Sequence, residues 1–83
     1  MDYRYVLDEE VAETLLTLSA RQRAEFIQIF RALAANPHQR GEQVFHDSTG
    51  REIQKLRFGR WLISYWPDHA VKEVRIVGIQ RTK

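Results

Sequence analysis

The spacing of the apolar residues changes once along this chain, at Asn36–Pro37, and this change constrains the fold more than any other feature. Before Pro37, apolar residues recur every three or four positions, which is typical of amphipathic helices. After Pro37, short β-branched and aromatic runs alternate with turn residues, which is typical of strands. Because proline disfavours helical geometry in the residue before it, the helical part is expected to end here.

Two helices are predicted before this boundary. After a short strand at residues 3–7, Asp8 caps a helix over residues 9–18. Ser19-Ala20-Arg21-Gln22 has the form of a capping box, so a second helix is expected from residue 20 to Asn36. The buried stripe of this second helix comprises Phe26, Ile27, Phe30, Leu33 and Ala34. Almost no loop separates the helices, which predicts an antiparallel hairpin.

The second half of the chain predicts a sheet. Strands are expected over residues 52–58, 60–66 and 71–79, with a further short strand at residues 43–46. Turn residues separate them, at 47–50, at Gly59 and at 67–70. The element order β-α-α-β-β-β predicts an α+β fold, with the helical hairpin packed on one face of a curled, mainly antiparallel sheet. A chain of 83 residues is expected to form one domain over residues 1–83.

Positive charge is concentrated in the second half of the chain. Residues 1–50 carry five Arg against eight Asp or Glu, a net charge of −3, whereas residues 51–83 carry eight Lys or Arg against three Asp or Glu, a net charge of +5. Ten of the 13 basic residues are Arg, whose planar guanidinium suits phosphates and stacks on bases. This pattern is compatible with a nucleic acid or an acidic protein as partner. The alternative is a solvated basic surface without a partner.

Several classes of function lack their sequence signals. The chain has no cysteine, which excludes disulfides and thiolate zinc sites. It has no Gly-rich phosphate loop, no nucleophile elbow and no paired metal-binding histidines, so we expect no cofactor and no metal. The longest uncharged apolar run, residues 61–66, is far shorter than the roughly 20 residues of a membrane span. No signal peptide is recognisable, and we expect a cytoplasmic protein without membrane contact.

Strand alternation predicts a basic surface on the sheet. Lys55 and Arg57 share one face of their strand, and Arg75 and Arg81 are expected to share a face of the last strand. These four residues are therefore predicted to line the face that the helices leave open, with Arg60 joining them from the turn after Gly59. The alternative is that Arg57 and Arg75 pair with Glu52 and Glu73.

Aromatic residues and one histidine complete the candidate site. Trp61 and Tyr65 share a face of the middle strand and offer stacking platforms for bases, whereas Trp66 points the other way. The alternative for all three is a place in the core. His69 lies in the last predicted turn, and its imidazole suits general acid–base catalysis if the turn reaches over the sheet. The alternative is a solvent-exposed histidine.

Three segments of the chain resemble the RelE/ParE superfamily of toxins from bacterial type II toxin–antitoxin pairs. Leu33-Ala34-Ala35-Asn36-Pro37 resembles the end of the second helix of that family. Residues 55–65, Lys-Leu-Arg-Phe-Gly-Arg-Trp-Leu-Ile-Ser-Tyr, resemble its hairpin, and residues 74–81, Val-Arg-Ile-Val-Gly-Ile-Gln-Arg, resemble its closing strand. The resemblance extends over almost the whole chain.

This resemblance implies a function in growth inhibition. RNA-cutting members are metal-independent endoribonucleases that cleave mRNA on the ribosome, where cations stabilise the charge that develops at the scissile phosphate. Lys55, Arg57 and Arg81 match basic positions of the family, so the resemblance implies that they are catalytic, with His69 as a candidate acid–base group. It also implies a cognate antitoxin as partner, and the exposed sheet edges leave a homodimer open.

The sequence departs from the pattern of the nucleases at three places. Leu62 replaces an arginine, Ile53 replaces a basic residue, and no tyrosine follows the last strand within these 83 residues. Members of the ParE-like branch share the fold but act on DNA gyrase. The alternative to a nuclease is therefore a gyrase poison, or a domain that has lost catalysis and binds another protein.

Overall fold

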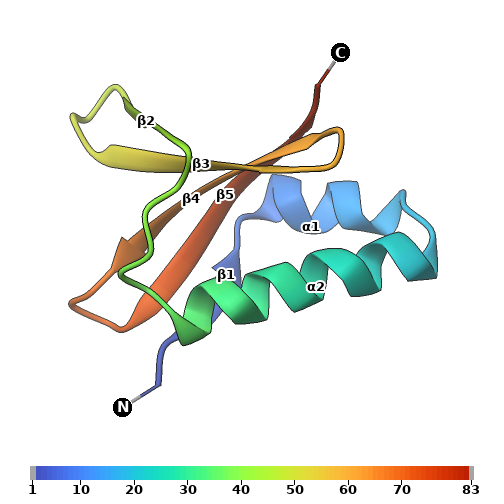
Figure 1. Cartoon of the computed structure of the whole chain (residues 1–83), viewed down its shortest axis with the longest axis horizontal. Helices are drawn as coiled ribbons and strands as arrows, with labels where there is room; N and C mark the ends of the chain where they lie inside the picture. Colours follow the sequence, from blue (N-terminus) through green and yellow to red (C-terminus); the bar gives the residue numbers. More distant parts are fainter. Residues whose placement is uncertain (1, 83) are drawn as a thin grey trace.

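The computed structural model describes residues 2–82, which form two helices and a five-stranded sheet (Figure 1). The elements are β1 (Arg4–Leu7), α1 (Glu9–Leu16), α2 (Ala20–Ala35), β2 (Gln43–His46), β3 (Glu52–Phe58), β4 (Trp61–Asp68) and β5 (Glu73–Arg81). The strand order is β1-β5-β4-β3-β2; β1 runs parallel to β5 and every other pair is antiparallel. The predicted α+β order is confirmed, including the short strand at residues 43–46.

Both helices begin where predicted, after Asp8 and Ser19, but the Asp8 side chain makes no capping hydrogen bond and only Ser19 caps its helix. Ser19 accepts a hydrogen bond from the backbone N–H of Gln22, and the Gln22 side chain accepts one from the backbone N–H of Ser19, which completes the capping box. Helix α1 ends at Leu16, two residues earlier than predicted, because the next two amides bond to carbonyls three residues back, as in a 3₁₀ turn. Within residues 2–82, no helix is long and apolar enough to cross a membrane.

The two helices lie side by side on one face of the sheet and bury its centre (Figure 1). The core comprises side chains from both helices and from β4 and β5: Val11, Leu15, Phe26, Phe30, Leu33, Ile63, Tyr65, Val74 and Ile76. The β2–β3 hairpin extends away from the helices (Figure 1). One face of the sheet is thus closed by the helices, and we call the other the open face.

Strand β4 is longer than predicted and continues through Pro67 to Asp68. Strand β3 pairs with β4 only as far as Tyr65, so Pro67 lies where one side of β4 has no partner strand, a position that tolerates proline. The chain reverses after Asp68 instead, and Lys72 adopts a positive φ of 55° just before β5. The last turn therefore lies about two residues later than the proline suggests.

A β-bulge changes the alternation of β5. Ser64 pairs with Gly78 and Tyr65 pairs with Ile76, so Val77 has no partner in β4. Before the bulge, Val74 and Ile76 point into the core. After the bulge, Ile79 does so, because its partner is the core residue Ile63. An extra residue in one strand thus reverses the faces of all positions that follow it.

The capping box yields a prediction about stability. Replacing Ser19 with Ala removes the acceptor for the Gln22 amide and is expected to cost about 1 kcal/mol of unfolding free energy. For a domain of this size, that loss corresponds to a melting temperature lower by about 4–8 °C. Thermal unfolding followed by circular dichroism measures it. Ser48→Ala in the exposed β2–β3 turn is the matched control, and equal melting temperatures for the two variants would contradict the prediction.

Candidate nucleic-acid interface

The open face carries a row of basic side chains along β3. In the register with β4, Lys55 pairs with Ser64 and Arg57 with Leu62. These positions alternate with the core residues of both strands, so Lys55 and Arg57 project from the open face, as predicted. Arg51, just before β3, joins them, because its guanidinium lies over the ring of Trp66 on the same face. We call Arg51, Lys55 and Arg57 the basic row.

Lys55 and Arg57 form no ion pair with any carboxylate of residues 2–82. The alternative pairing of Arg57 with Glu52 does not occur. The Glu52 carboxylate instead accepts a hydrogen bond of 3.2 Å from the Arg40 guanidinium. The Lys55 ammonium lies 4.4 Å from the centroid of the Phe45 ring. The Arg57 side chain is exposed, while its backbone N–H donates to the Glu42 carboxylate. Their charges are therefore available to an external anion such as a phosphate.

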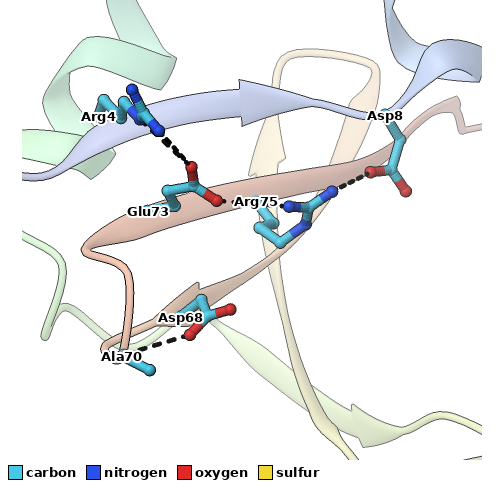
Figure 2. A network of polar contacts seen from close by, with 6 residues as sticks. All are labelled: Arg4, Asp8, Asp68, Ala70, Glu73 and Arg75. Carbon is cyan, nitrogen blue, oxygen red and sulfur yellow. Dashed lines mark hydrogen bonds and ion pairs between the residues drawn. The ribbon is translucent and has the colours of Figure 1, made fainter.

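Arg75 also lies on the open face, but carboxylates within the protein compensate its charge. Its guanidinium contacts Glu73 at 3.4 Å and Asp8 at 3.5 Å, and Arg4 contacts the other oxygen of Glu73 at 2.9 Å. Figure 2 shows these four side chains as a chain of alternating charge across β1 and β5. The Glu73 side chain is only 12% exposed, which makes its negative charge costly to bury. The guanidinium groups of Arg4 and Arg75 offset this cost. The alternative predicted ion pairs across neighbouring strands, but Arg75 pairs with Glu73 within β5.

Arg81 does not share a face with Arg75, and the prediction that it does is wrong. The bulge at Val77 reverses the alternation, and Arg81 pairs with Trp61, whose ring packs on the core. The Arg81 guanidinium lies 5.6 Å from the centroid of that ring. Arg81 and Arg60 lie at the same end of the sheet as Arg57, because the Arg60 carbonyl accepts two hydrogen bonds from Thr82. The three arginines thus surround the β3–β4 turn from different sides.

Trp61 and Tyr65 share a face of β4, as predicted, but it is the helix-covered face. The Trp61 ring packs edge-on against Phe26 at 5.3 Å between centroids. Tyr65 is buried, and its hydroxyl donates a 3.4 Å hydrogen bond to the Gln39 carbonyl. Burial raises the pKa of the Tyr65 phenol above its ordinary value of 10.0. The expected role in base stacking is therefore wrong for Tyr65, and the alternative of a place in the core is correct.

Trp66 is the aromatic residue of β4 that lies on the open face. The Arg51 guanidinium lies 3.9 Å from the centroid of its ring. A hollow of about 390 Å³, which we call the Trp66 hollow, is lined by Phe45, Arg51, Ile53, Trp66, Arg75 and Val77, together with Asp8 and Asp47. Sequence reasoning placed Trp66 opposite Trp61 but did not select it or Arg51, because alternation within a strand does not say which face the helices cover.

Asp47 and the β2–β3 turn hold Arg51 beside this hollow. One Asp47 oxygen accepts from the backbone N–H groups of Thr49 and Arg51 and from the Thr49 hydroxyl. These hydrogen bonds lower the pKa of Asp47 below its ordinary value of 3.8. The bond from the Thr49 hydroxyl has the largest effect, and the two backbone bonds have smaller ones. The carboxylate is thus ionised and engaged within the turn, and it fixes the start of β3.

His69 does not reach over the open face. Its Nδ1 lies 2.6 Å from the Tyr3 hydroxyl, and its ring stacks on that of His38 at 4.9 Å between centroids. This position is at the far end of β4 from Arg57 and Arg81, about 20 Å away at the rise of a strand. The structure thus separates His69 from Arg57 and Arg81, although His69 lines a hollow of about 400 Å³ together with Arg51 and Trp66. Among residues 2–82, no third metal-ligating side chain joins the two histidines in a cluster.

The fold is similar to that of proteins in two solved toxin–antitoxin complexes. One is the archaeal RelE–RelB complex from Pyrococcus horikoshii, with a TM-score of 0.77 and 18% identity over 98% of this chain and 96% of the other. The second is the RelBE2 complex from Mycobacterium tuberculosis, with a TM-score of 0.77 and 17% identity over 98% and 99%. No protein-family model matches the sequence, and no curated protein matches it significantly. The chain therefore has the RelE-like fold that the sequence resemblance predicts.

The burial of Tyr65 yields a prediction about pH. The folded state keeps the phenol protonated at a pH where the unfolded chain, with its pKa near 10.0, releases the proton. The raised pKa therefore makes stability fall as the pH rises above about 10, whereas Tyr65→Phe lacks this contribution. We expect the variant to lose less unfolding free energy than the parent between neutral and alkaline pH. Urea unfolding at both pH values measures the difference, and an equal loss in both proteins would contradict burial of the phenol.

Proposed function

We propose that this chain is the toxin of a type II toxin–antitoxin pair and that it inhibits translation by cleaving mRNA on the ribosome. The observation that carries the proposal is the pair of uncompensated cations, Lys55 and Arg57, on the face that the helices leave open. The similarity of the fold to two toxin–antitoxin complexes over nearly the whole chain supports it.

In this proposal the protein acts by electrostatics. The mRNA backbone lies along the basic row, and Lys55 and Arg57 contact phosphates. The ribose 2′-oxygen attacks the adjacent phosphorus, gives up its proton to water, and forms a 2′,3′-cyclic phosphate as the P–O5′ bond breaks. The 5′-oxygen leaves and takes a proton from water, and the nearby cations stabilise the negative charge that develops on the phosphate oxygens. Arg60 and Arg81, at the same end of the sheet as Arg57, extend the positive field around the reacting group. No metal ion is needed for this reaction.

The proposal includes a cognate antitoxin. Its binding segment is expected to be acidic, because charge complementarity with the basic row accelerates association. Strand β2 is an edge of the sheet, and its Val44 and Phe45 are 40% and 39% exposed, so an extended segment of the antitoxin can pair there. Such a segment would also cover the neighbouring Lys55 and thereby neutralise the toxin.

A second candidate is a member of this fold that binds a protein target, such as DNA gyrase, without cutting RNA. One observation favours it: Tyr65, expected to stack on bases, and His69, the candidate acid–base group, both lie away from the open face. Ile53 and Leu62 on that face, where the RNA-cutting members have basic residues, point the same way. The two candidates differ in whether growth arrest is accompanied by new mRNA ends.

Expression under tight control in a bacterium, followed by mapping of mRNA 5′ ends, tests the proposal. We expect growth arrest, new ends within translated messages, and relief of both by the neighbouring antitoxin gene. Growth arrest without new ends would favour the protein-binding candidate, and normal growth would contradict both.

The site makes a sharper prediction for single variants. Arg57→Ala is expected to lower mRNA cleavage by about 10²- to 10³-fold, which is typical when one stabilising donor is removed from a developing anion. Arg21→Ala is the matched control, because Arg21 is an exposed arginine in α2, on the helix-covered side. Quantified 5′ ends at equal protein levels measure the effect, and equal cleavage by both variants would exclude Arg57 from the site.

A further inference from the structure

The Trp66 hollow lies beside the basic row and is not used by the phosphate contacts proposed above. Its volume of about 390 Å³ falls within the range of about 300–1,000 Å³ that is usual for small-molecule sites. It combines apolar and aromatic walls with two arginines and two carboxylates. Apolar and aromatic walls with polar groups among them are typical of ligand sites, and this hollow is more highly charged than most.

The floor of the hollow is a row of side chains that crosses the sheet. Phe45 pairs with Ile53 between β2 and β3, and Trp66 pairs with Arg75 between β4 and β5. Val77, the extra residue of the bulge, also lines the hollow. Val77 lies on the same face as Arg75 by ordinary alternation, and the bulge leaves it without a partner in β4.

The contact between Arg51 and Trp66 indicates what the floor can bind. The guanidinium is planar and lies 3.9 Å from the ring centroid, which is the position that a stacked base takes on an aromatic side chain. An exposed cation–aromatic contact raises an association constant by only about 2- to 5-fold. Stacking of one base on an aromatic ring raises the binding constant of the RNA by about 5- to 150-fold. A base that takes this position also frees the Arg51 charge for a phosphate of the same strand.

The walls supply partners for the edge of a base. Arg75 presents N–H donors, and Asp8, 3.5 Å away, presents acceptor oxygens. Because Asp8 and Glu73 compensate the charge of Arg75, this wall suits a neutral polar group better than a phosphate. Base edges carry both donors and acceptors, which matches this mixed pair.

We propose that the Trp66 hollow binds one unpaired base of single-stranded RNA, stacked on Trp66, while the basic row holds the adjacent phosphates. The proposal rests on the proposed function in taking the open face as the RNA-binding face. It adds a binding subsite for a base, in which Trp66 is the stacking residue and Arg51, displaced from the ring, contacts a phosphate.

Binding of a short, mixed-sequence, single-stranded oligoribonucleotide to the free protein tests this inference. In a Trp61→Phe background, Trp66 is the single tryptophan of the chain, and we expect the RNA to quench its fluorescence. Trp66→Leu is expected to weaken binding by about 5- to 150-fold, whereas Trp66→Phe retains a flat ring and most of the affinity.

The salt dependence separates stacking from charge. Each phosphate contact with a single strand contributes about 0.7 to the slope of log affinity against log salt concentration. Lys55→Ala is therefore expected to lower the slope by about 0.7, while Trp66→Leu leaves it unchanged. Circular dichroism and thermal unfolding verify that each variant is folded.

Two outcomes would overturn the inference: no quenching of Trp66 by the RNA, or equal affinity of folded Trp66→Leu and the parent. The proposed function is judged separately, by growth arrest and new mRNA ends. RNA binding at Trp66 without growth arrest would support the inference and contradict the proposed function. If mRNA cleavage depends on Arg57 but not on Trp66, and Trp66→Leu keeps the RNA affinity of the parent, the proposed function is supported and the inference is contradicted.

Discussion

The packing of Phe26 and Phe30 against Ile63, Tyr65 and Ile76 decides which face of the sheet is closed. Each of these side chains is at most 2% exposed, and burial of one large apolar side chain contributes about 1.5–3 kcal/mol. Together they fix the helical hairpin on one face. Every other residue of the sheet is then assigned to the core or to the open face by its position in the alternation.

The bulge at Val77 is the second constraint, because it separates Arg75 from Arg81. It keeps Ile79 in the core after Val74 and Ile76, although the three do not follow a strict alternation. As a result, Arg81 lies on the helix-covered face and is near the open face only at the end of the sheet, beside the β3–β4 turn. Arg75 and Val77 instead line the Trp66 hollow.

The basic residues of the open face differ in whether carboxylates of the protein compensate their charges. Arg75 is held between two carboxylates, and the Arg4–Glu73–Arg75–Asp8 chain stabilises the parallel pair of β1 and β5. Lys55 and Arg57 have no such partners within residues 2–82. Uncompensated cations repel one another and contribute little to the stability of a fold. Their charges are therefore available to an external anion.

The sequence by itself determined the order of the elements, the capping box at Ser19 and the shared face of Lys55 and Arg57, because helix capping and strand alternation depend on neighbouring residues. It also placed Trp66 opposite Trp61 and Tyr65. Only the tertiary structure decided that Tyr65 lies in the core, that Arg81 changes face and that His69 lies at the far end of β4. These positions depend on the packing of the helices, on one unpaired residue in β5 and on where the last turn packs, and all three arise from contacts between segments far apart in the chain.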